Sequence, residues 1–422
     1  MNNNKQEIPS GKSSKEHLDE DKSLLKKTLL EEDVKSPRKD DTPILKENLI
    51  QDKRKKSTNS RFKDFLKKQD IEISFQRYAI DALGAMALGL FASLLIGTIV
   101  NTIASLIGYD TSLGATLQTI GQYASQATGS AMAVAIGYSL KAPPLVLFTL
   151  AGVGLAANEI AGAGGPLAVL IIALITTEMG KLVSKTTKID IIVTPLVTLI
   201  VGVGLSLWWA PAIGAAATAV GSAVIWATEQ QPFIMGILVS VIMGIALTLP
   251  ISSAAIAAAF GLVGLAGGAA HAGCCAQMVG FAVMSYKENK VGGLLAQGLG
   301  TSMLQMPNIV KNPKIWIPPT LASAITGPLS TMVFKIEMNG PPISSGMGTS
   351  GLVGPIGVLT GWVNPSEVAL SHGAVVLNAT IIDYVGLLLI SIVLPAILTY
   401  LFAIPLRKIN WIKENDLKLN LG

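Results

Sequence analysis

The sequence predicts an all-α membrane protein with about ten transmembrane helices and two re-entrant hairpins. Half of its 422 residues are hydrophobic, and the mean hydropathy is +0.54. Charge is concentrated at one end: residues 1–72 hold 18 of the 32 basic and 15 of the 27 acidic side chains, which leaves 26 charged residues among the other 350. A soluble surface carries about 25–35% charged residues, so a soluble globular protein is excluded. The 42 glycines, with only 5% aromatic residues, favour helices packed closely in lipid.

Residues 1–60 are predicted to be a disordered, charged cytoplasmic tail. They are rich in Lys, Glu, Asp, Ser and Asn and contain no Phe, Tyr or Trp, so they cannot bury enough apolar surface to offset the entropy of ordering. Residues 61–80 are predicted to be an interfacial amphipathic helix, because Phe62, Phe65 and Leu66 stand among lysines. A solvated linker is the alternative for this second segment.

Apolar runs recur from residue 79 onward and make up a predicted transmembrane domain over residues 81–408. Its ten predicted spans cover residues 82–107, 117–140, 143–158, 165–184, 190–208, 211–228, 232–249, 254–285, 316–336 and 376–404. Small residues spaced four apart within these runs allow helices to approach closely. Residues 409–422 are predicted to be a short cytoplasmic tail.

Two stretches do not fit simple spans and are predicted to be re-entrant hairpins. Residues 291–306 are too short for a span, and residues 337–361 hold seven glycines and three prolines in 25 positions. Irregular backbone cannot face lipid, because each unpaired N–H or C=O group costs several kcal/mol there. At membrane depth both stretches must therefore pack against protein or line a cavity.

The loop charges predict an orientation. Of the 14 basic residues after position 72, Lys335 alone is misplaced if the N-terminal tail is cytoplasmic, which agrees with the positive-inside pattern. Both termini of the multi-pass chain are then cytoplasmic. The basic residues lie beside apolar segments, so they indicate a lipid bilayer and not nucleic acid as the partner.

Polar side chains within the apolar part predict a substrate site. His271 lies in the middle of its span and Glu337 opens the second hairpin, although an ionised group in hydrocarbon costs roughly 2.5–3.5 kcal/mol. Asn339, Ser344 and Ser345 follow Glu337 closely. A carboxylate, an imidazole, an amide and hydroxyls suit a neutral polyhydroxylated ligand. An anionic ligand favours Arg, and no Arg occurs between residues 77 and 407.

Other interpretations stay open for both ionisable groups. His271 also suits a structural hydrogen bond between helices, or part of a soft-metal site with Cys274 and Cys275. A structural zinc site needs four ligands, and no others are visible. Glu337 also suits a salt bridge with Lys335.

No catalytic signature is present. The membrane part has two histidines, His271 and His372, and neither lies by a serine-nucleophile motif. The hairpin glycines follow no predicted strand, so they do not form a nucleotide fingerprint. We predict no catalytic residue, no metal and no cofactor.

The run EMNGPPISSGMGTSGLVGPIG at residues 337–357, together with His271 in the preceding long span, resembles the EIIC components of the bacterial sugar phosphotransferase system. Residues 72–408 more closely resemble the EIIC-like family that includes the perfringolysin regulator PfoR. The resemblance implies a fold like the glucose-superfamily EIICs, in the bacterial cell membrane, as a homodimer of bundles with a dimerisation half and a transport half. It also implies that Glu337 and His271 hold the sugar, with Asn339 near by.

The resemblance implies a permease that translocates a sugar or sugar-like solute at a midplane site by alternating access. Two alternatives stay open: an EIIC that works with separate EIIA and EIIB proteins in phosphorylation-coupled uptake, and a PfoR-like membrane sensor or regulator. Residues 1–60 contain no Cys and are too unstructured to be an EIIA or EIIB domain. The Glu-Pro dipeptide common in glucose-type hairpins is also missing, because Met338 follows Glu337.

Overall fold

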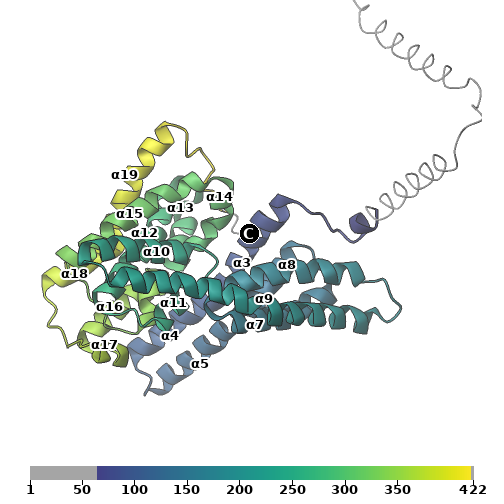
Figure 1. The fold of residues 1–422 in the computed structure, drawn as a ribbon, viewed down its shortest axis with the longest axis horizontal. Helices are drawn as coiled ribbons and strands as arrows, with labels where there is room; N and C mark the ends of the chain where they lie inside the picture. The colour runs from purple at the N-terminus through teal and green to yellow at the C-terminus, as the bar shows by residue number, and fades with distance from the viewer. Residues whose placement is uncertain (1–63, 420–422) are drawn as a thin grey trace, which may run out of the picture. The chain divides into compact units, whose positions relative to one another are not determined.

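The structure is a computed structural model that describes residues 64–419, and its main body begins at Leu66. Within this range the chain is helical, and its one β-type pairing is an isolated antiparallel bridge between Gly264 and Met338. The helices pack as two bundles, one before and one after residue 230 (Figure 1). The predicted tail over residues 1–60 lies outside the described residues.

The first bundle starts with one helical rod from Gln76 to Ile107, in which π-helical turns separate the α-helical stretches. Its elements are η2 (Gln76–Asp81), α3 (Ala82–Leu90), η3 (Phe91–Leu95), α4 (Ile96–Ile107), α5 (Ser112–Gln126), α6 (Thr128–Ser139), α7 (Pro144–Ala161), η4 (Gly162–Gly164), α8 (Gly165–Val183) and α9 (Asp190–Thr228). α3 packs on α6, α4 packs on α5, and α7 lies against α6, α8 and α9.

Glycines with positive φ mark two turns of this bundle. Gly108 (φ 94°) ends α4 and Gly162 (φ 52°) ends α7. Side chains with a Cβ are strained at such angles, so glycine lets the chain turn there. The apolar stretch Pro144–Val183 is therefore two packed helices, α7 and α8, and not a single 40-residue rod.

α9 differs from the prediction, because it is one continuous helix of 39 residues where two spans, 190–208 and 211–228, were expected. Pro211 lies inside it without ending it. Contacts on both sides of Pro211 support the helix: Gly202 lies against Val153 of α7, and Gly214 lies against Ala161. At about 1.5 Å per residue α9 is about 58 Å long, well above a bilayer core of about 30 Å. Figure 1 shows it as a long teal rod beside α7 and α8.

A buried lysine ties the chain before η2 to this bundle. Lys181 at the end of α8 is 1% exposed, and its Nζ donates to the backbone carbonyls of Asp70 (2.8 Å) and Leu140 (2.9 Å). Arg77 donates to the Asp70 carboxylate at 2.9 Å. Residues 71–74 are not helical. The predicted interfacial helix over 61–80 is therefore interrupted in its described part.

The second bundle is built around a buried helix, α12, which packs against α10, α15 and α19. Its main elements are α10 (Pro232–Thr248), α11 (Ser253–Ala259), α12 (Gly264–Met284), α15 (Ile317–Pro328), η8 (Leu329–Val333), α17 (Glu367–Ser371), α18 (Ile381–Leu388), η11 (Leu389–Val393) and α19 (Leu394–Lys408). The predicted span 254–285 is divided, because Gly261 and Gly264 both adopt a φ of 60° and separate α11 from α12.

The chain reverses within the first predicted hairpin, 291–306. α13 (Tyr286–Leu295) and η5 (Ala296–Gly300) lead to Thr301, which is extended, and η6 (Ser302–Gln305) and α14 (Met306–Lys311) lead back. Gln305 Nε2 donates to Gln297 Oε1 at 2.8 Å, so the two arms lie side by side.

The second predicted hairpin, 337–361, also runs out and back. It contains η9 (Pro342–Gly346), η10 (Ser350–Leu352) and α16 (Val353–Val363). A Cβ placed on Gly361 would meet the backbone of Asn339 and Gly340, so the two arms touch without intervening side chains. That either hairpin re-enters a bilayer remains a prediction.

The described residues include four helical stretches that are long and apolar enough to cross a membrane: Gln76–Ile107, Pro144–Val183, Asp190–Thr228 and Ile381–Lys408. They confirm a helical membrane protein. The count of ten spans is not confirmed.

Residues 409–419, the described part of the predicted short tail, pack against the helices. Ile412 is 2% exposed and Leu417 is fully buried, and both belong to the core that includes Met284 and Leu304.

Candidate functional site

Glu337 and Asn339 are positioned by a short extended segment beside the start of α12. Met338 exchanges two backbone hydrogen bonds with Gly264, at 2.9 and 3.0 Å. Side chains alternate along extended backbone, so Met338 is buried on one side while its two neighbours share the other. Asn339 Nδ2 donates to Glu337 Oε2 at 3.0 Å. Trp362 of α16 fixes the segment further, because its Nε1 donates to the Glu337 carbonyl at 3.2 Å.

These two side chains line a cavity of about 310 Å³. Its wall combines the end of α9, the turn between α11 and α12, and the end of α17. The volume lies at the lower end of the range for small-molecule sites, which is about 300–1,000 Å³. Ile225 and Thr228 come from the first bundle, whereas Glu337 comes from the second. The cavity therefore lies where the two bundles meet.

His372 lines the same cavity and was not among the predicted site residues. It follows α17, and its Nδ1 lies 2.8 Å from the carbonyl oxygen of Val368. A carbonyl can only accept, so Nδ1 carries the proton and, in the neutral ring, Nε2 is left as an acceptor. Histidine is rare in the membrane part, which has only two, and this rarity could have marked His372 as a candidate site residue. The sequence analysis instead assigned His271, the other histidine, to the site with Glu337.

His271 does not line this cavity. It is fully buried in α12, where its Nε2 lies 2.9 Å from Ser391 Oγ and 3.5 Å from Cys275 Sγ. Gly264 pairs with Met338, the residue after Glu337. His271 lies seven residues further along α12 than Gly264, a distance of about 10 Å along a helix. The structure therefore gives His271 the helix–helix hydrogen bond that was its alternative assignment.

The remaining predicted site residues lie outside the cavity. Ser344 and Ser345 are buried in η9, and Ser345 Oγ donates to the carbonyl of Pro342 at 2.8 Å. Lys335 is exposed, and no ion pair joins it to Glu337 within the part of the chain that the structure describes.

The structure adds no further ligand to the possible soft-metal site of His271, Cys274 and Cys275. Across residues 64–419, no group of three or more His, Cys, Asp or Glu side chains is placed to hold a metal ion. Cys274 Sγ contacts the carbonyl of Met243, and Cys275 contacts His271. The first contact joins α12 to α10, whereas the second lies within α12.

One comparison with known proteins identifies a family. The family model described as "Phosphotransferase system, EIIC" matches residues 80–419, about four-fifths of the chain. No curated protein and no solved structure matches. The match extends past residue 408, the predicted end of the membrane domain, and includes the packed residues 409–419.

Proposed function

The chain belongs to the EIIC family of the phosphotransferase system and is a membrane sugar-transport component of it; from this premise we propose that its solute is a neutral sugar bound in the cavity of Glu337, Asn339 and His372. The single observation that carries the proposal is that these three polar side chains line one cavity where the two bundles meet.

The chemistry of the lining fits hydroxyl donors. Glu337 offers carboxylate oxygens, one of them already oriented by Asn339, and His372, whose Nδ1 faces the Val368 carbonyl, offers Nε2. Sugar hydroxyl groups can donate to all of these. No Lys or Arg is among the residues that line the cavity in the described structure. A sugar acid or a sugar phosphate would therefore bring a negative charge beside Glu337 with no cation to offset it.

The position of the cavity supports alternating access. If Lys188 lies at the cytoplasmic face, as predicted, the continuous α9 ends toward the outer face, and the start of α12 lines the same cavity as that end. The sugar then enters from outside. A movement of the second bundle against the first would close this side of the cavity, as in transporters that work by rocking of two bundles around a site. The homodimer and the cytoplasmic termini remain predictions.

The two cysteines of this chain are not placed to phosphorylate the sugar. Cys274 and Cys275 are fully buried in α12, so neither is placed to carry a transferable phosphoryl group in water. We propose that separate EIIA and EIIB proteins supply this group at the inner face.

Reconstitution tests the proposal. A thermal-shift screen against neutral sugars and sugar acids identifies the solute, and proteoliposomes then measure its uptake, with EIIA, EIIB and phosphoenolpyruvate added or omitted. We expect a neutral sugar to stabilise the protein and to be phosphorylated when both proteins are present. Glu337→Gln, which keeps the shape and the contact to Asn339, should lower uptake at least tenfold. Uptake at the wild-type rate by this variant would contradict the proposal.

The same assay separates transport from the regulatory alternative. Deletion of residues 1–60 should leave uptake unchanged if the chain is a permease, because the cavity lies wholly within the family-matched region. A PfoR-like regulator would instead lose its output on this deletion while still binding sugar.

A further inference from the structure

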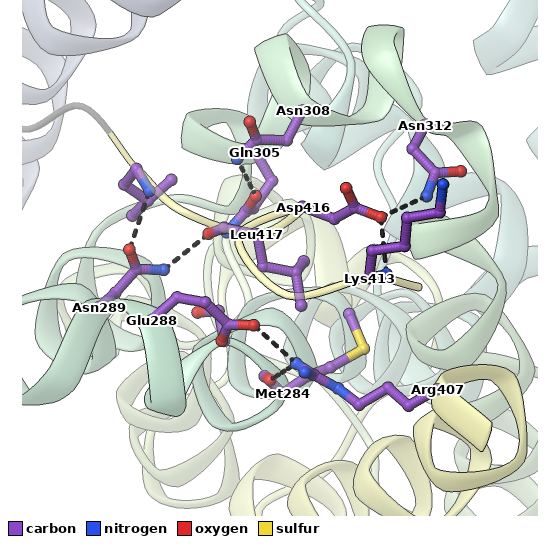
Figure 2. Close-up of polar contacts among 12 residues, drawn as sticks. Met284, Glu288, Asn289, Gln305, Asn308, Asn312, Arg407, Lys413, Asp416 and Leu417 are labelled. Carbon is purple, nitrogen blue, oxygen red and sulfur yellow. Dashed lines mark hydrogen bonds and ion pairs between the residues drawn. The ribbon is translucent and has the colours of Figure 1, made fainter. Parts of the chain in front are cut away.

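We propose that residues 409–419 form a C-terminal clasp, which holds the two arms of the first hairpin together and couples that hairpin to α19. The inference concerns a different part of the molecule from the sugar cavity and does not depend on the proposed solute. It rests on a network of hydrogen bonds between side-chain amides and backbone, shown in Figure 2.

The chain folds back as soon as α19 ends. Asn410 adopts a φ of 57°, and the backbone N–H of Trp411 donates to the carbonyl of Leu406 at 2.9 Å. Arg407 Nη2 donates to the carbonyl of Met284 at 2.9 Å and to Glu288 Oε1 at 3.1 Å. The start of the clasp is thus fixed where α12 ends and α13 begins.

One backbone carbonyl joins both arms of the hairpin. The Leu417 oxygen accepts from Asn289 Nδ2 of α13 at 2.7 Å and from Gln305 Nε2 of η6 at 3.0 Å (Figure 2). Asn289 is used twice, because its Oδ1 accepts from the N–H of Leu419 at 2.8 Å. The Leu417 side chain is fully buried at the same point. Removal of the clasp would leave Asn289 and Gln305 without these partners.

Further amides extend the contact along α14. Asn308 Nδ2 donates to the carbonyl of Lys418 at 3.0 Å, and Asn312 Nδ2 donates to Asp416 Oδ2 at 2.7 Å and to the carbonyl of Trp411 at 2.8 Å. Most of these donors bind backbone oxygens. The contact therefore depends on the backbone conformation of the clasp more than on its exposed side chains.

Every hydrogen bond described above joins the clasp to the second bundle, whereas Leu417 and Leu419 share a buried apolar core with Met86 of the first bundle. A cavity of about 540 Å³ also lies between the clasp and the first bundle, with Asn415 and Lys418 on one side and Asp81 and Tyr138 on the other. At its opposite end the hairpin also contacts the second bundle, through a 2.8 Å hydrogen bond between Ser302 Oγ and Thr248 Oγ1 of α10. The clasp thus fixes the end of the hairpin at which α13 begins and α14 ends, so a displacement of α19 carries the hairpin with it.

Hydrogen exchange on the purified full-length protein tests the clasp. Asn289→Asp keeps an acceptor for the Leu419 N–H but places a carboxylate oxygen against the Leu417 carbonyl. Removal of residues 411–422 deletes the clasp itself. We expect amide exchange in residues 286–312 to rise about tenfold in Asn289→Asp and further in the truncated chain, because local opening becomes less costly. Exchange in α7, in the first bundle, should not change.

The matched control is Glu414→Ala, a change of an exposed clasp residue whose side chain makes no hydrogen bond in the described structure. It should exchange like the wild type. If the truncated chain does not fold, Asn289→Asp and the milder Asn308→Ala decide the question. Exchange in residues 286–312 within twofold of the wild type in the variants that fold would overturn the proposal.

Discussion

Glu337 and Asn339 show how a single backbone pairing decides which side chains form a site. Both flank Met338, and the bridge from Met338 to Gly264 turns the two side chains to the same side. The polar residues of this segment could be recognised from sequence, because a carboxylate is costly to place in an apolar stretch and therefore indicates a functional site. The bridge could not be predicted, since it joins residues far apart in the chain and depends on how α12 begins.

Replacing each of the two histidines of the membrane part should affect a different property: sugar affinity for His372 and thermal stability for His271. His372→Ala should weaken sugar binding about tenfold, the effect of about one lost hydrogen bond, and should hardly change the melting temperature because the side chain is exposed. His271→Ala should lower the melting temperature, because it leaves a cavity and removes the partner of Ser391, at a cost of about 2–4 kcal/mol.

Calorimetric titration with the screened sugar and a thermal melt of each variant separate these outcomes. A His271→Ala protein that melts like the wild type but has lost sugar affinity would return His271 to the site. A His372→Ala protein with full affinity would remove His372 from it.

Asp70 gives a pH-dependent prediction outside the membrane-spanning helices. Partial burial acts to raise its pKa, but the hydrogen bond and charge of Arg77, with Lys141 and Lys181, outweigh this and hold the pKa below its ordinary value of 3.8. A lowered folded-state pKa stabilises the protein above the ordinary value, and this contribution is lost as the pH falls through the folded-state value.

The corresponding experiment compares the wild type with Asp70→Asn by denaturant unfolding in detergent. The variant should be less stable at neutral pH by less than about 1 kcal/mol, because the carboxylate is nearly half exposed. The difference should shrink as the pH falls below 4. A difference that is constant from pH 7 to pH 3 would show that the charge of Asp70 has no part in it.

At the scale of elements, the apolar runs predicted where helices lie and failed to predict how they join. The expected boundary at residues 209–210 was wrong because Pro211 is tolerated inside α9, where packing on α7 and α8 compensates for a missing N–H. The expected continuity of 254–285 was wrong for a related reason. Gly261 and Gly264 serve as turn residues, whereas the same spacing of glycines also suits close helix packing.

Gly268 tests the packing of the second hairpin on α12. A Cβ at this position would collide with the carbonyl oxygen of Ile336, the residue before Glu337. Gly268→Ala should therefore destabilise the protein by about 1–3 kcal/mol and weaken sugar binding, because the segment that positions Glu337 must shift.

Gly204→Ala is the matched control, since a Cβ on this exposed α9 glycine meets nothing within 4 Å. It should be neutral or stabilising by up to about 1 kcal/mol. Thermal melts and sugar titrations of both variants give the comparison. Equal stability of the two variants would show that the second hairpin does not pack on α12 as described.

At the scale of the whole molecule, composition and charge placement predicted a helical membrane protein, and the family match across residues 80–419 agrees. The division into two bundles and the shared cavity follow from packing between distant helices. Such packing leaves little trace in a single sequence, because lipid-facing and buried faces are equally apolar. The packed position of residues 409–419 was missed for a different reason: its hydrogen bonds involve backbone carbonyls, which every sequence has.

The orientation of the chain is testable by cysteine labelling in intact cells. The native Cys274 and Cys275 are fully buried, so the wild type should label weakly. Asp110→Cys, in the turn between α4 and α5, should react with a membrane-impermeant maleimide. Lys188→Cys, in the exposed turn before α9, should react only after the membrane is permeabilised. Since the Glu337 cavity lies near the end of α9, opposite to Lys188, the reverse pattern would place that cavity on the cytoplasmic side and would invert the proposed direction of sugar entry.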